Sequence, residues 1–234
     1  IMSLKCNGNF FSGQEEIAEV TYEYYDKLFG RPPGRAFSVD FSLLEMQATV
    51  LSHLEVPFTE EEVEKVVKSM PRDKAPGPDG FTGRFFVSSW QIIRADFMNA
   101  LDHFHREDMR GLEAVNKALV SLLPKKAGAV DIKDFRPVSL ISGPVKIFDK
   151  ILAIRLAEDL PKLVGLHQSA FIKGRPIHDN FMLVQCTTCR LHSFRDPIVL
   201  VKLDISKAFD FVKWPFLLEV LTHMGFGMKW ISWI

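Results

Sequence analysis

The strongest constraint on the fold is a short apolar run near the end of the sequence, Ile198 to Leu203, which leads directly into Asp204. Because the run is nearly continuous, rich in β-branched residues and preceded by Pro197, it predicts a buried strand rather than a surface strand. An ionised carboxylate at the tip of such a strand is costly to bury alone, which favours a place in a cleft or beside a cation. The alternative is an aspartate that simply leaves the core for a turn.

The composition indicates a globular protein. The chain has 234 residues, 47% of them hydrophobic, which is enough for a sizeable core in one large domain or two small ones. No run of about 18 uncharged apolar residues and no charged-then-apolar leader occurs, so we expect an intracellular protein that neither spans a membrane nor is secreted. Cys186 and Cys189 lack the second pair that would close a zinc site, and we expect them to be half-buried.

Charge is unevenly distributed along the chain although the net charge is zero. Residues 1–70 hold 6 Lys/Arg and 12 Asp/Glu, whereas residues 117–175 hold 11 Lys/Arg and 5 Asp/Glu. This asymmetry predicts that the middle segment faces a polyanion. A solvated basic face with no partner is the alternative.

Apolar residues recur at helical spacing in several segments. These are 14–29, 84–105, a segment from Gly143 to about Leu160, one from Asp179 to Arg190, and one that follows Thr59. Thr59 is a suitable N-cap, and Glu62 would complete a capping box. The aromatic stripe within 84–105 is typical of a helix face buried in a core.

Two extended segments, 118–126 and 135–140, flank a loop that contains Gly128 and predict a hairpin. Lys125 and Arg136 stand at its facing ends, where they can reach over a triphosphate. Two exposed basic side chains on an ordinary hairpin are the alternative. The string KAPGPDGF at 74–81, with two prolines and two glycines within five residues, predicts a stiff turn.

The order of these segments resembles the reverse transcriptase domain of non-LTR (LINE-type) retrotransposons, especially the plant kind. The strings that carry the resemblance are KAPGPDGF at 74–81, SLLPKK at 121–126, FRPVSL at 135–140, KIFDKILAIRL at 146–156, QSAFIKGR at 168–175 and VKLDISKAFDFVKW at 201–214. They cover roughly residues 59–234. The resemblance implies an α+β fold: a mostly helical fingers region with a basic β-hairpin, joined to the first strand and helix of a palm. It divides the chain into a connecting extension (1–58), the fingers (59–197) and the start of the palm (198–234).

The resemblance also implies a site. Asp204 matches the first palm carboxylate, which ligates two Mg²⁺ ions, and the carbonyl of Ile205 would bind one of them. The deoxynucleoside triphosphate would lie against Lys125, Arg136, Ala208 and Phe209, with the Phe209 ring excluding a ribose 2′-hydroxyl. The RNA template and DNA primer would lie near Gln168, Gly174 and Arg175. Asp210 would have a structural role, and the helix that follows, with Pro215 in its first turn, would belong to the core.

One departure from the family pattern limits the expected activity. The family needs a second box, aromatic-x-Asp-Asp, and no Asp-Asp pair occurs in this sequence. Because one carboxylate cannot hold two Mg²⁺ ions, we expect this chain alone, which reads as a fragment cut at both ends, to lack polymerase activity. Two alternatives stay open: a non-catalytic nucleic-acid-binding remnant, and a phosphotransferase with Asp204 as nucleophile, for which a phosphate-cradling loop is missing. The resemblance implies a nuclear or cytoplasmic ribonucleoprotein.

Overall fold

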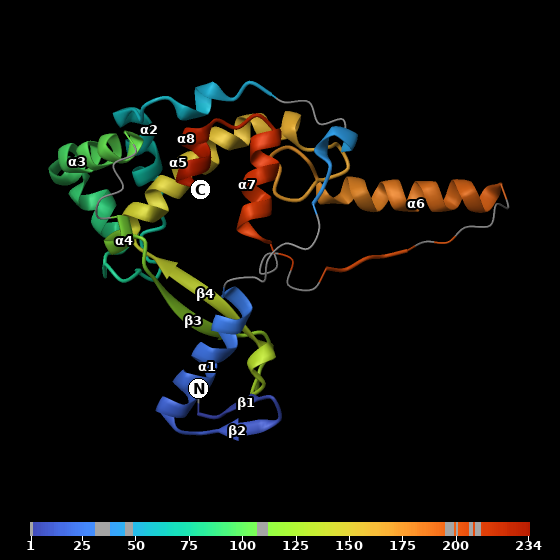
Figure 1. Cartoon of the computed structure of the whole chain (residues 1–234), viewed down its shortest axis with the longest axis horizontal. Helices are drawn as coiled ribbons and strands as arrows, with labels where there is room; N and C mark the ends of the chain where they lie inside the picture. Colours follow the sequence, from blue (N-terminus) through green and yellow to red (C-terminus); the bar gives the residue numbers. More distant parts are fainter. Residues whose placement is uncertain are drawn as a thin grey trace. The chain divides into compact units, whose positions relative to one another are not determined.

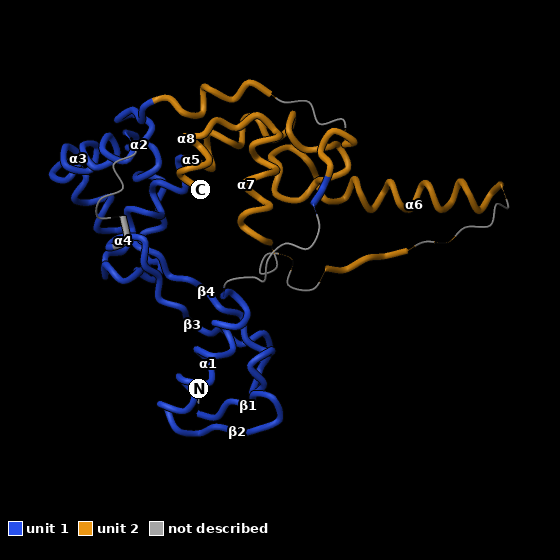
Figure 2. The backbone as a smooth tube through the Cα atoms, in the orientation of Figure 1, with its two compact units in different colours: residues 1–39, 57–151 blue, residues 40–56, 152–234 orange. Residues whose placement is uncertain are grey.

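The computed structural model describes residues 2–30, 38–44, 49–106, 112–194, 199, 201–205, 208 and 212–234. The chain divides into two compact units (Figure 2). Unit 1 comprises residues 1–39 and 57–151, and unit 2 comprises residues 40–56 and 152–234. The content of helices and small sheets agrees with the predicted mixed α+β class.

The predicted helices after Thr59 and at 84–105 both form in unit 1. Helix α2 (Glu60–Lys68) begins where the Thr59 hydroxyl accepts a hydrogen bond of 3.2 Å from the Glu62 amide. Helix α3 (Gly83–His105) buries Phe86, Trp90 and Leu101, which confirms that its aromatic stripe belongs to the core. The short helix α4 (Leu112–Val115) follows and precedes the β-hairpin that begins at Ala118.

The predicted basic hairpin is confirmed. Strands β3 (Ala118–Pro124) and β4 (Phe135–Ile141) pair antiparallel, with Ala118 opposite Ile141 and Pro124 opposite Phe135. The loop between them contains the 3-10 helix η3 (Ile132–Asp134). Since Ile141 leads almost directly into α5, the base of the hairpin joins the helical part of unit 1 and its loop lies at the other end (Figure 1).

The N-terminal residues form a second small sheet that the sequence analysis did not predict. Strands β1 (Leu4–Cys6) and β2 (Asn9–Phe11) pair antiparallel across Asn7 and Gly8, and both residues have positive φ. Asn-Gly is the pair that favours such a two-residue loop, so a local signal was available. Helix α1 (Gln14–Phe29) follows with the predicted bounds and buries Tyr25.

Unit 2 contains most of the remaining helices. Helix α5 (Gly143–Leu163) begins in unit 1 and ends in unit 2, and it is followed by α6 (Ile177–Ser193), α7 (Trp214–His223) and α8 (Met228–Trp233). Two 3-10 helices precede them, η1 (Phe41–Leu44) and η2 (Ser52–Glu55). Trp230 of α8 is 2% exposed, and its amide donates to the Glu55 carboxylate at 2.7 Å. No helix in the described residues is long and apolar enough to cross a membrane.

A buried carboxylate fastens η2 to α5. Asp159 Oδ2 lies 2.6 Å from His53 Nε2, and Lys162 Nζ lies 3.5 Å from Asp159 Oδ1. The hydrogen bond from His53 is the main reason why the pKa of Asp159 lies below its ordinary value of 3.8, although burial opposes the shift. Arg155 Nη1 of α5 donates to the carbonyls of Leu54 and Val56, so the segment is held at several points.

We expect this pair to make unit 2 sensitive to acid. A lowered carboxyl pKa in the folded state contributes stability above the unfolded pKa, and that stability is lost as the pH falls through the folded value. Replacing His53 by alanine should return the pKa of Asp159 toward its ordinary value and move acid unfolding to higher pH. Tryptophan fluorescence followed from pH 7 to pH 2 measures this midpoint. The matched control is His178→Ala, at an exposed position on α6, which should leave the midpoint of acid unfolding unchanged. Equal midpoints for H53A and wild type would contradict the expectation.

The prediction of a buried strand at 198–204 is wrong for the residues that the structure describes. Residues 199 and 201–205 form no strand, and Val199, Val201 and Leu203 are 87%, 68% and 85% exposed. A strand requires a neighbour that pairs with its backbone groups. Among the described residues, the two sheets are formed by β1 with β2 and by β3 with β4, and the run belongs to neither of them, so it has no such neighbour.

Two further predictions of burial fail for the same reason. Helix α7 forms with Pro215 in its first turn and Gly225 in the left-handed region after it, but none of its residues is buried. Two of its rings lie against Phe41: the centroid of His223 is 4.2 Å from the Phe41 centroid, and that of Phe216 is 6.3 Å from it. Cys186 and Cys189 are exposed rather than half-buried, because α6 likewise buries none of its residues. The expected sheet that would have covered this region is not formed by the described residues.

Candidate functional site

Asp204, the residue on which the predicted site depends, is exposed. Asp204 and Ile205 lie in a segment without regular structure and have exposed side chains, and Ala208 lies in an exposed turn. Phe209 and Asp210 fall outside the described residues. The structure therefore leaves the Asp204 carboxylate open to solvent, and it places no described strand behind it.

The Asp204 carboxylate and the Ile205 carbonyl are oxygen donors of the type that magnesium binds, but they are too few to hold two ions. A carboxylate and a backbone carbonyl are ligands that Mg²⁺ accepts. Within the described residues, however, no group of three or more His, Cys, Asp or Glu side chains could hold a metal ion. The described residues do not build a two-ion site around Asp204.

Lys125 and Arg136 lie at the loop end of the β3–β4 hairpin and are exposed. The Lys125 amide donates to the Asp134 carbonyl at 2.8 Å, and its ammonium donates to the Lys133 carbonyl at 2.6 Å. Lys126 forms an ion pair of 2.8 Å with Asp134. These contacts close the loop on itself and hold Lys125 and Lys126 at its mouth. Both Lys125 and Arg136 belong to unit 1, whereas the other predicted site residues belong to unit 2.

The predicted template and primer residues lie in the loop between α5 and α6, where Arg175 has a clear structural role. Its Nη1 donates to the carbonyls of Gly165 and Gln168 at 2.6 and 2.9 Å, and its Nη2 to those of Pro161 and Val164 at 2.9 and 3.0 Å. The last carbonyls of a helix lack partners within the helix. Arg175 thus caps the C-terminal end of α5, and its four terminal N–H donors are already engaged.

The rest of this loop is also well fixed. Asn180 of α6 donates to the His167 carbonyl and to the Ser169 hydroxyl, both at 3.0 Å, and Ser169 is buried. Sequence reasoning missed Asn180, which carries no local signal for this contact. Gly174 has φ +83° and open space where a Cβ would lie, so its conformation rather than close packing calls for glycine. Phe171 is 88% exposed and has φ +66°, an unusual backbone for an aromatic residue.

The cap that Arg175 forms can be tested by a conservative change. Lysine carries one ammonium on a flexible stem and cannot reproduce a planar fork that reaches four carbonyls. Arg175→Lys should therefore lower the free energy of unfolding of unit 2 by about 2 kcal/mol. Urea denaturation followed by circular dichroism measures it.

Lys173→Ala in the same loop is the matched control, because Lys173 is exposed. It should change stability by no more than about 0.5 kcal/mol. If Arg175→Lys weakened RNA binding at unchanged stability, Arg175 would act on nucleic acid directly and its role as a cap would be refuted.

The KAPGPDGF turn caps the other end of α5. The Asp79 carboxylate accepts a hydrogen bond of 2.6 Å from the amide of Gly143, the first residue of α5, where the helix dipole favours negative charge. Lys146 Nζ donates to the Ala75 carbonyl at 3.1 Å. Gly77 is buried against the backbone of Ile141, the last residue of β4. The predicted stiff turn is confirmed, and its docking on the junction of β4 and α5 was not predictable from the string.

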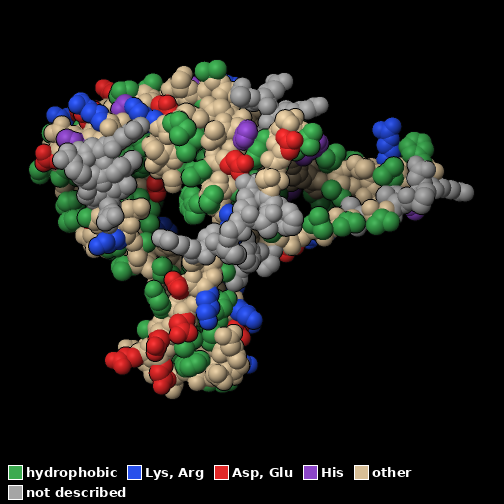
Figure 3. Space-filling view, viewed as in Figure 1, with side chains coloured by type: hydrophobic (Ala, Val, Ile, Leu, Met, Phe, Trp, Pro, Cys, Tyr) green, Lys and Arg blue, Asp and Glu red, His purple; other side chains and the backbone are tan. Residues whose placement is uncertain are grey.

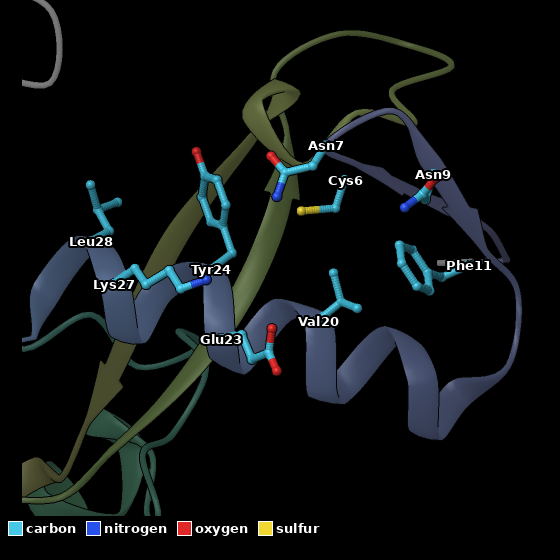
Figure 4. Close-up of a pocket in the computed structure, with 9 residues that line it drawn as sticks. All are labelled: Cys6, Asn7, Asn9, Phe11, Val20, Glu23, Tyr24, Lys27 and Leu28. Atoms are coloured by element: carbon cyan, nitrogen blue, oxygen red, sulfur yellow. The ribbon is translucent and has the colours of Figure 1, made fainter.

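A pocket of about 400 Å³ lies between the β1–β2 hairpin and α1 (Figure 4). Cys6 and Phe11 line it from the hairpin, and Val20 and Tyr24 line it from α1. None of the predicted site residues lines this pocket, so it is separate from the candidate site.

Comparison with known proteins finds a family match for the second half of the chain. Residues 123–234 match the family model described as reverse transcriptase (RNA-dependent DNA polymerase). The chain is 34% identical to the Transposon TX1 uncharacterized 149 kDa protein of Xenopus laevis over 77% of its length. It is 28% identical, over 76% of its length, to the Pol polyprotein from type-1 retrotransposable element R2 of Nasonia vitripennis. It is 23% identical, over 98% of the chain's own length, to the Pol polyprotein from type-2 retrotransposable element R2DM of Drosophila melanogaster.

These relatives are much longer than the chain. The matched segments cover 14%, 17% and 21% of the three proteins in the same order. All the residues predicted to bind nucleotide, metal, template or primer fall within the 123–234 match.

Proposed function

Because residues 123–234 match the reverse transcriptase family and the chain matches retrotransposon proteins, we propose that it is part of an RNA-directed DNA polymerase of a non-LTR retrotransposon. The reaction is nucleotidyl transfer from a deoxynucleoside triphosphate onto a primer 3′-hydroxyl, directed by an RNA template. The observation that carries the proposal is the family match over a segment that includes every predicted site residue.

The β3–β4 hairpin would grip the incoming nucleotide. Lys125 and Arg136 are exposed at its loop end, where their charges are available to a triphosphate. Arg136 suits contact with a base as well, since a guanidinium is planar and can stack while it donates hydrogen bonds. Ala208 and Phe209 would lie under the sugar, and the Phe209 ring would select deoxyribose by excluding the 2′-hydroxyl.

Asp204 would be the catalytic carboxylate, and with the Ile205 carbonyl it would supply oxygen ligands to magnesium. Bound Mg²⁺ would neutralise charge on the triphosphate.

The loop between α5 and α6 would contact template and primer through Gln168, Gly174 and the exposed parts around them. In this loop Arg175 would act by shaping the backbone, since carbonyls of the same loop and of α5 already occupy its terminal donors. The division into extension (1–58), fingers (59–197) and palm (198–234), the kinship to plant elements and a nuclear or cytoplasmic location are parts of the same proposal.

Primer extension tests the proposal. Because the chain spans only 14–21% of its relatives, the assay uses a retrotransposon polyprotein that contains it. A DNA primer annealed to an RNA template should be extended when Mg²⁺ and deoxynucleoside triphosphates are present, and much less with ribonucleoside triphosphates. Absence of extension with a well-folded polyprotein would refute the assignment.

A second candidate is a non-catalytic nucleic-acid-binding segment, which the cations of residues 117–175 favour. Phosphate contacts release counterions, so binding of the 234-residue chain to RNA should weaken steeply as salt rises. RNA binding by the chain that does not depend on salt, or no binding at all, would remove this candidate.

A further inference from the structure

The loop of the β3–β4 hairpin is packed into the N-terminal residues. Ile132 and Phe135, from the loop and the start of β4, form one buried cluster with Leu4 and Cys6 of β1 and Tyr25 of α1. Ile132 is 1% exposed and Phe135 is 5% exposed. Along its two strands the hairpin buries only Phe135, since six of the seven residues of β3 are exposed and the other residues of β4 are exposed or half-buried. Its loop end is therefore stabilised mainly by this cluster.

Backbone contacts join the same two parts. The Lys5 amide donates to the Val130 carbonyl at 2.7 Å, and Lys5 forms a parallel bridge with Asp131. Strand β1 thereby pairs with β2 on one edge and with the hairpin loop on the other (Figure 1). A free loop end would have to satisfy these groups with water and would gain conformational freedom.

Lys125 and Arg136, the two cations of the proposed nucleotide site, are close in sequence to this packing. Arg136 follows the buried Phe135 directly, and Lys125 donates through its amide and ammonium to Asp134 and Lys133, which form η3 together with the buried Ile132. Any movement of η3 would therefore displace both cations.

We propose that residues 2–29 are a brace that positions Lys125 and Arg136 for the incoming nucleotide, with Leu4 and Tyr25 as positioning residues. The functional part of this inference rests on the proposed polymerase activity. The brace acts through packing rather than through contact with nucleic acid, because acidic side chains gather over α1, among them Glu15, Glu16, Glu19, Glu23 and Asp26 (Figure 3).

Hydrogen exchange tests the packing in the 234-residue chain. Lys5→Pro removes the amide that donates to Val130, whereas Lys5→Ala keeps that amide and serves as the matched control. We expect amides of residues 125–136 to exchange about five to ten times faster in K5P and at the wild-type rate in K5A.

A second pair of variants tests the packing of side chains. Ile132→Ala should speed exchange in the same residues, whereas Val130→Ala, at a site 41% exposed, should not. Unchanged exchange in both K5P and I132A would overturn the brace, whatever the polymerase assay shows.

Steady-state kinetics of the longer polyprotein tests the positioning role. K5P should raise the KM for the deoxynucleoside triphosphate about tenfold and leave kcat nearly unchanged, because the chemical step does not involve the brace. Faster exchange together with an unchanged KM would overturn the positioning role and leave only a structural brace. A wild-type polyprotein without activity would refute the proposed function, while the exchange result would still decide whether the brace exists.

Discussion

Replacing Asp204 by alanine should lower primer extension by a polyprotein that contains this chain by about a thousandfold or more. The carboxylate is exposed and lies in a segment without regular structure, so its removal opens no cavity in the described core. Loss of activity should therefore come without loss of stability. In the proposed site, the D204A change removes a ligand of Mg²⁺, the ion that would neutralise charge on the triphosphate, and such electrostatic contributions are among the largest in catalysis.

Asp96→Ala is the matched control, since Asp96 is an exposed carboxylate within α3 and far from the proposed chemistry in sequence. It should retain wild-type extension. Thermal unfolding of both variants separates a catalytic from a structural effect. Wild-type synthesis by D204A would show that this aspartate simply ends an apolar run, which is the alternative interpretation of the sequence.

Gly77→Ala should lower the free energy of unfolding of unit 1 by about 3 kcal/mol, near the upper end of the cost of overpacking. A Cβ at position 77 would meet the carbonyl of Ile141 and the amide of Ser142, which are backbone atoms and cannot rotate away. The turn would have to separate from the junction of β4 and α5. The hydrogen bond from Gly143 to Asp79 would then also be weakened. Urea denaturation of the 234-residue chain measures the change.

Two other glycines in the chain provide controls of graded severity. Gly80 ends the same turn with φ +72° and open space around it, so Gly80→Ala should cost about 1 kcal/mol through backbone strain alone. At Gly165 no atom lies within 4 Å of the place that a Cβ would take, and φ is not positive, so replacement by alanine should change stability by at most about 0.5 kcal/mol. If G77A were as mild as G80A, the turn would not be docked as described.

Local patterns in the sequence were sufficient for most helices and for the basic hairpin. The spacing of apolar residues predicted the bounds of α1 and the buried stripe of α3, and Thr59 marked the start of α2. These features depend on contacts within a few residues, where capping and periodicity act directly. The nucleotide-gripping role of Lys125 and Arg136 followed from the resemblance and remains a prediction.

Contacts between distant segments were not accessible in the same way. The docking of the turn on α5 joins Asp79 to Gly143, and the brace joins Leu4 to Ile132. Neither pair can be predicted from neighbouring residues, because the residues around each partner indicate only the turn or strand in which that partner lies. Arg175 was assigned to nucleic acid for the same reason, since nothing in its neighbours indicates that four carbonyls surround it.

The amino-acid sequence was enough to recognise the likeness to reverse transcriptases, the local helices and hairpin, and the residues proposed to act on nucleotide and nucleic acid. Burial that depends on contacts between distant segments, in contrast, became apparent only from the folded chain. The apolar run before Asp204 has the composition of a buried strand but is exposed where described, because a strand also needs a partner and a covering layer. Conversely, the loop that carries the two cations is ordered through a cluster assembled from residues more than 100 positions apart, which no single stretch of sequence could specify.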